Sequence, residues 1–166
     1  MTEISFNVFD PDSIDRAVAQ LEAYETSLDQ KAKELCERLA QMGALYAEWN
    51  FTGVLYAGDT GCQITVEQQS ENSYVVNADG QAVLFMEFGA GAKHGYGHPK
   101  AQELGMGPGT YPNGKGHWDD PKGWWFGEKG NWTHTYGNAP GMPMYNAAQD
   151  IRNEILQVAQ EVFNTT

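Results

Sequence analysis

Apolar side chains recur at alternating intervals of three and four residues over the first third of the chain. From Ile14 to Trp49 only Glu25 interrupts this spacing, which predicts an amphipathic helix of about 36 residues. The stripe consists of Ile14, Val18, Leu21, Leu28, Ala32, Leu35, Leu39, Met42, Tyr46 and Trp49. Asp10 and Pro11 suit the N-cap and the first turn. The spacing fits either a long helix packed on its own sheet, which we favour, or a coiled coil.

Two details qualify this helix. Ser27 with Gln30 resembles a capping box directly after the break at Glu25, so the helix is expected to be either continuous or broken near residue 26. Before the helix, the alternation of Ile4, Phe6 and Val8 is typical of a short edge strand.

A period of two residues replaces the helical spacing after residue 61. Cys62, Ile64 and Val66 alternate with polar residues, which predicts a half-buried strand. A turn at 71–72 leads to a second strand around 74–76. A further turn is expected at 77–80, where Gly80 would supply a positive φ. The apolar run 82–88 is then predicted as a third, more central strand, which completes a three-stranded antiparallel meander.

A second helical stripe closes the chain behind Pro143. Its members are Met144, Ala148, Ile151, Ile155, Val158 and Val162. The predicted fold class is α+β: a long N-terminal helix, the meander, a long Gly- and Trp-rich loop, and a C-terminal helix packed on the sheet. We expect one domain over 1–166, with a scaffold formed by 1–88 and 144–166 and an inserted loop or arm over 89–143.

The predicted loop differs in composition from the scaffold. It holds 14 of the 19 glycines, all four histidines and four of the five tryptophans, and its five lysines against four acids give a charge of +1. The other residues carry −13, which makes the chain −12 overall. So acidic a surface disfavours static binding of nucleic acid in a basic groove.

The sequence also bears on location and on the state of the cysteines. No run reaches the roughly 20 apolar residues of a spanning helix, and the first residues lack a signal-peptide pattern, so we expect no membrane attachment and synthesis in the cytoplasm. Two cysteines are too few for a disulfide framework. Cys36 and Cys62 are therefore expected to be reduced and buried.

Side chains able to carry chemistry are present, but not in a catalytic pattern. His94 and His98 are four residues apart, yet the glycines between them and Pro99 argue against a helix that would place both on one face. Asp119, Asp120, His117 and His134 add ligand types without a known ligand spacing. No serine or cysteine is placed as a nucleophile, and 105–109 lacks the ending of a P-loop. We predict exposed loop histidines, no catalytic residue, no metal, no cofactor and no enzymatic activity.

The aromatic residues of the loop are its most unusual feature. They are Tyr96, Tyr111, Trp118, Trp124, Trp125, Phe126, Trp132 and Tyr136. A loop of this composition cannot bury all of them alone. Because Trp and Tyr are preferred anchors of protein interfaces, we favour a contact arm for subunits or partners. A loop that folds back over the scaffold core and a sugar-binding platform remain alternatives.

Two short motifs resemble those of the HK97 gp10-like family of phage proteins. The segment Met86-Glu87-Phe88-Gly89-Ala90-Gly91 is similar to the family's (Val/Met)-Glu-Phe-Gly-x-Gly motif. Residues 138–147 resemble its Gly-x-x-Ala-x-Pro-Phe-Met-x-x-Ala entry into the last helix, although Pro143 stands where the family has Phe. The motif positions are Glu87, Phe88, Gly89, Gly91, Pro140, Met144 and Ala147. The order of elements is also that of the family.

The resemblance implies a virion structural protein of a long-tailed bacteriophage, made in the host cytoplasm and located at the neck or tail. Such tail-completion or head–tail joining proteins form a ring, commonly hexameric. The ring contacts the head connector or stopper on one side and the tail tube or tail terminator on the other. Double-stranded DNA passes through it without sequence-specific binding. Acids facing such a lumen would repel phosphate, and Glu67, Glu71 and Asp79 are the candidates.

Glu87 has a structural role in this interpretation. It lies between apolar neighbours, and an unpaired buried carboxylate is costly, so it should accept hydrogen bonds from the start of the loop or from a neighbouring subunit. Two other classes of function remain open: a metal-dependent or cell-wall-directed hydrolase, and a carbohydrate-binding module that uses the Trp-rich loop.

Overall fold

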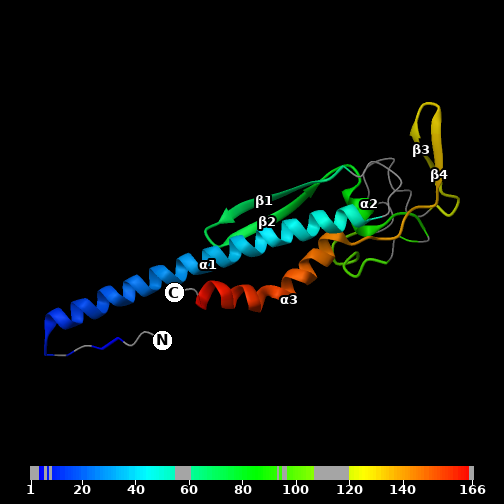
Figure 1. The fold of residues 1–166 in the computed structure, drawn as a ribbon. Coiled ribbons are helices and arrows are strands. Elements are labelled where there is room, and N and C mark those ends of the chain that lie inside the picture. Colours follow the sequence, from blue (N-terminus) through cyan, green and yellow to red (C-terminus); the bar gives the residue numbers. More distant parts are fainter. Residues whose placement is uncertain are drawn as a thin grey trace.

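The computed structural model describes residues 4–5, 7, 9–54, 61–92, 94, 97–106 and 120–164. Its first helix, α1, spans Pro11–Gly53 (Figure 1). Asp10 is the N-cap residue, with extended angles of φ −122° and ψ 100°, and Pro11 lies in the first turn as predicted. The strand expected around residues 4–8 includes Phe6 and Val8, which lie outside the described residues.

Of the two alternatives for the first helix, the structure has the continuous one, and no break occurs near residue 26. Thr26 Oγ1 donates a hydrogen bond to the carbonyl of Glu22 at 2.9 Å within the helix. Glu25 is exposed, so its charge in the apolar stripe is not desolvated. Since the helical backbone already satisfies the N–H groups near Ser27, a capping box there has nothing to bond.

The next two elements are the antiparallel strands β1 (Gln63–Ser70) and β2 (Ser73–Asp79), joined by the predicted turn at 71–72. One face of this hairpin packs on α1, where a methyl group added at Gly43 would lie 3.6 Å from Val76 Cγ2. The second predicted turn, at 77–80, is displaced, because β2 continues through Asp79 and the chain turns at 80–82. Gly80 is not among the residues with positive φ. Glycine is required at position 80 because the Cβ of any other residue would overlap the carbonyl oxygen of Gly61.

The predicted third strand is wrong, since residues Val83–Phe88 form a short helix, α2. The sheet of β1 and β2 therefore has two strands and no meander. A short apolar run fits a buried strand or a buried helix equally well by pattern alone. Here Val83, Met86 and Glu87 are buried at helical spacing. The N–H of Met86 donates to the carbonyl of Ala82 at 2.9 Å, as in a helix.

The predicted loop contains a second hairpin that the sequence pattern did not reveal. Strands β3 (Trp124–Glu128) and β4 (Asn131–Thr135) pair antiparallel and form a separate two-stranded sheet. Figure 1 shows this hairpin projecting from the end of the molecule at which α1 ends and α3 begins.

The last helix, α3 (Pro143–Asn164), begins at Pro143 as predicted, but its main packing partner is α1 and not the sheet. The two helices run antiparallel. Tyr46 donates to Glu154 at 2.8 Å, and Arg38 Nη2 lies 2.7 Å from Glu161 Oε2. A hydrogen bond from Gln157 and the bonded Arg38 lower the pKa of Glu161. A two-stranded sheet is too narrow to cover both helices, so their apolar stripes cover each other.

The core of the described part is small and lies where α1, α2 and β1 meet. Phe51, Ala82, Val83 and Met86 form it, and Met86 is completely buried. A second cluster joins Phe88 to Ala101. No described helix carries an apolar stretch that would cross a membrane.

Candidate functional site

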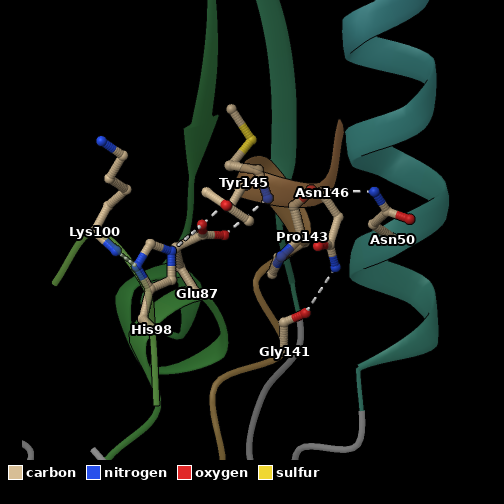
Figure 2. Close-up of polar contacts among 9 residues, drawn as sticks. Asn50, Glu87, His98, Lys100, Gly141, Pro143, Tyr145 and Asn146 are labelled. Carbon is tan, nitrogen blue, oxygen red and sulfur yellow. Dashed lines mark hydrogen bonds and ion pairs between the residues drawn. The ribbon is translucent and has the colours of Figure 1, made fainter. Parts of the chain in front are cut away.

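The last turn of α2 places a carboxylate at the start of α3. Glu87 Oε2 accepts a hydrogen bond from the N–H of Met144 at 2.8 Å, and Oε1 accepts one from the N–H of Tyr145 at 3.0 Å (Figure 2). These residues follow Pro143, which has no N–H, so Glu87 satisfies donors that a helix N-terminus leaves unpaired. Its charge also faces the positive end of the helix dipole. Glu87 therefore caps α3 from a different helix.

Glu87 has a third partner, the imidazole of His98. His98 Nε2 lies 3.0 Å from Glu87 Oε1, and His98 Nδ1 accepts the N–H of Lys100 at 3.0 Å. Because Nδ1 is an acceptor, the proton is on Nε2, and a neutral imidazole donates to the carboxylate. The side chains of His98 and Glu87 are 1% and 8% exposed, respectively. The prediction of exposed histidines is thus wrong for His98, and its two ring nitrogens are both engaged. We call Glu87, His98, Met144 and Tyr145 the Glu87 junction.

Next to the Glu87 junction, two chain segments cross at the base of the arm. Ala90 and Asn138 exchange backbone hydrogen bonds of 2.9 and 3.1 Å. Gly91 and Gly137 have φ angles of 85° and 97°. A Cβ on Gly137 would overlap the carbonyl oxygen of Ala90. The two segments therefore approach too closely for any residue but glycine at positions 91 and 137.

The other residues of the two motifs lie around this crossing. A Cβ on Gly89 would come within 2.7 Å of the nitrogen of Pro140. The ring centroid of Phe88 is 4.5 Å from that of His98. Ala147 is buried in the second turn of α3. The two sequence motifs, about 50 residues apart in the chain, thus meet in space at the Glu87 junction.

The projecting hairpin gathers aromatic side chains on one face. Trp125 pairs with His134, and Trp132 pairs with Gly127, so these side chains and that of Tyr136 share a face of the strand pair. His134 makes edge contacts with Trp125 and Tyr136 at centroid distances of 4.9 Å. Trp125, Trp132 and Tyr136 are 64%, 57% and 51% exposed. We call Trp125, Trp132, His134 and Tyr136 the aromatic face.

Of the other predicted contact residues, two lie on the opposite face of the hairpin and three lie outside the described residues. Trp124 and Phe126 point to the opposite face of the hairpin and are half-buried. Tyr96, Tyr111 and Trp118 lie outside the described residues.

The three candidate lumen acids are exposed on or next to the β1–β2 hairpin. Val66 and Val76 form a pair on the face that packs on α1. Glu67 and Asp79 belong to the alternate set of positions and therefore lie on the outer face. Glu71 is in the connecting turn. The structure brings these acids onto one hairpin.

No metal site emerges from the part of the chain that can be described. Its His, Cys, Asp and Glu residues include no group of three or more that could hold a metal ion. Asp120 accepts the N–H of Lys122 at 2.9 Å, while His117 and Asp119 lie outside this part. Cys36 and Cys62 are free thiols, both half-buried, and burial together with Asp79 raises the pKa of Cys62.

Comparison with known proteins adds no relative. No family model, no curated protein and no solved structure matches this chain. The Glu87 junction and the aromatic face are therefore interpreted from their own geometry.

Sequence reasoning missed two residues of this region. The sequence predicts His98 as an exposed loop residue, with metal binding as the alternative, although a buried carboxylate at Glu87 requires donors. Asn138 donates through Nδ2 to the carbonyl of Phe85 at 2.8 Å and so ties the returning segment to α2. The burial of Glu87 was the signal that further donors exist, but the spacing does not tell which residues supply them.

Proposed function

We propose that this chain is a structural protein of a long-tailed bacteriophage that forms a ring at the head–tail joint, as a tail-completion or neck component. One observation carries the proposal: an exposed aromatic face on a projecting arm, attached at a junction built from the two phage-like motifs. The ring joins the head connector to the tail tube and lets DNA pass.

The aromatic face supplies the subunit contact. Trp and Tyr side chains release much water when buried and dominate the energetics of protein interfaces. A ring needs a heterologous contact, in which one surface of a copy meets a different surface of the next. A hairpin that projects from the end of the molecule is suited to reach that neighbour.

The Glu87 junction supports this role because it holds together the segments from which the arm projects. It links α2, α3 and the segment of His98 through three hydrogen bonds to one carboxylate. Since the arm leaves and returns at the Ala90–Asn138 crossing beside it, the junction fixes the direction of the arm. A fixed arm loses less entropy on assembly than a free one.

The charge distribution agrees with passage of DNA. The chain carries −12, and Glu67 and Asp79 are on the hairpin face that points away from α1. Carboxylates lining a channel repel phosphates within about 8 Å at physiological salt. An acidic lumen would keep the genome from adhering.

The aromatic face can be tested by removing both exposed indoles. We expect the purified wild-type chain to form rings in light scattering and native mass spectrometry. Trp125→Ala/Trp132→Ala should remain a folded monomer. Trp49→Ala, which removes an exposed Trp from α1, is the matched control and should still assemble. Unchanged assembly of the double variant contradicts the proposal, and loss of its circular dichroism signal would instead favour the core-covering alternative.

A carbohydrate-binding module is the second candidate, because several exposed aromatic rings on one face can also stack on sugars. It predicts that the monomer binds polysaccharide from the host cell wall and that Trp125→Ala/Trp132→Ala abolishes this binding. The two functions are distinguishable, since sugar binding does not require a ring.

A further inference from the structure

The N-terminal part of α1 extends beyond the last turn of α3 and the β1–β2 hairpin (Figure 1). The last turn of α3 is held opposite Lys31, whose Nζ donates to the carbonyl of Phe163 at 3.2 Å. The helix continues from there back to Pro11 past the end of α3 (Figure 1). At 1.5 Å per residue this extension is about 28 Å long.

This extension carries an apolar stripe that is exposed. Ile14, Val18, Leu21 and Leu28 are 38%, 48%, 54% and 37% exposed, and we call them the exposed stripe. The same spacing continues into Leu35, Leu39 and Met42, which are half-buried where α1 packs on α3 and the hairpin. The covered half of the stripe thus packs against α3 and the β1–β2 hairpin, and the exposed half has the same pattern. A helix is the occupant that this pattern fits.

The charges beside the exposed stripe indicate what kind of helix would bind there. Asp15, Glu22 and Asp29 each follow a stripe residue and recur every seven positions, so they form one acidic edge. All three are exposed, and their carboxylates form no ion pair with any residue that the structure describes. Glu25 adds a fourth carboxylate within the stripe itself. The edge favours a partner that presents Lys or Arg.

A second copy of the chain does not meet this requirement. In an antiparallel pair of identical helices, the acidic edge would face itself. In a parallel pair it would face the opposite edge, which carries Ala17, Tyr24 and Lys31, and Glu25 within the stripe would face its own copy. Like charges across such a seam are repulsive, which selects against self-pairing.

We propose that the exposed stripe and its acidic edge dock an amphipathic helix of a different protein, one whose apolar stripe is bordered by Lys or Arg. This inference does not depend on the aromatic face or on ring formation. It assigns a heterotypic contact to one end of the molecule and leaves the other end for contacts between copies.

The test uses the full-length chain and two synthetic helical peptides with identical Leu stripes, one with Lys and one with Glu along both edges. Fluorescence anisotropy should show about tenfold tighter binding of the Lys peptide, from three exposed charge pairs. This preference should shrink in molar salt. Asp15→Lys/Glu22→Lys/Asp29→Lys should reverse the preference.

The matched control changes the same number of charges elsewhere. Glu67→Lys/Glu71→Lys/Asp79→Lys should keep the preference for the Lys peptide. Equal loss of preference in both variants would reduce the effect to general attraction by an acidic protein and overturn the proposal. So would the absence of binding, or self-association of the wild type that Leu21→Glu abolishes.

Discussion

At the residue scale, one side chain serves three donors. The carboxylate of Glu87 is bonded to the N–H groups of Met144 and Tyr145 and to His98 Nε2. Its side chain is nearly buried, so water cannot readily replace it. A buried donor that loses its partner costs about 1–3 kcal/mol. Glu87 is therefore expected to matter for stability more than the exposed acids of the chain do.

Glu87→Ala should lower the free energy of unfolding by about 3–5 kcal/mol, because it leaves all three donors unpaired. Glu87→Gln keeps the shape and an acceptor oxygen, so its loss should be clearly smaller. Urea unfolding followed by Trp fluorescence measures both. A change below about 1 kcal/mol for Glu87→Ala would show that the bonds are not structural.

At the element scale, the attachment of the arm depends on how closely two backbones approach each other. The Ala90–Asn138 bridge connects the segment after α2 to the segment before α3. Gly137 has a φ of 97° and no room for a Cβ. Gly130, in the turn between β3 and β4, has the same φ of 97°, but a Cβ added there would meet no atom within 4 Å. Substituting each of these two glycines therefore distinguishes the cost of a steric overlap from the cost of backbone strain alone.

Gly130→Ala should cost only the strain of its left-handed backbone, about 1–2 kcal/mol. Gly137→Ala adds an overlap with the carbonyl of Ala90 and should be destabilising by several kcal/mol more, or should release the arm. Thermal unfolding and limited proteolysis between residues 89 and 143 compare the two variants. Equal effects of both substitutions would mean that the crossing is not a tight attachment.

The two long helices and the β1–β2 hairpin were predictable, whereas α2 and the β3–β4 hairpin were not. The positions of α1 and α3 follow from stripes that extend over many turns. The sequence predicts a strand where α2 lies, because the seven-residue run 82–88 is too short to hold a decisive period. The β3–β4 hairpin was missed, although Lys129-Gly130 between aromatic segments is a turn signal.

For the site, the sequence predicted that Glu87 needs hydrogen-bond donors but not which residues supply them. A carboxylate between apolar residues indicated that Glu87 needs donors, and the structure supplies them. Which donors these are depends on the path of the chain from 89 to 143. His98 and the start of α3 reach Glu87 through contacts 11 and 57 residues apart, and no periodicity encodes such distances.

At the scale of the whole molecule, the exposed stripe and the aromatic face lie far apart. The exposed stripe is near the N-terminal end of α1, and the aromatic face is on the hairpin beyond the other end (Figure 1). A chain with one surface for its own copies and another for a different protein can close a ring and still bind a neighbour. This is the arrangement that a joint between a head and a tail requires.

The decisive experiment for the proposed function is made in a phage that carries this gene. If the chain completes the joint, stopping its translation early should leave filled heads and separate, intact tails in electron micrographs of lysates. Wild-type chain supplied in trans should restore joined particles, and so should Trp49→Ala. Trp125→Ala/Trp132→Ala should fail, because its rings cannot form. Normally joined virions in the absence of the chain would remove the joining role, whatever the purified protein assembles into.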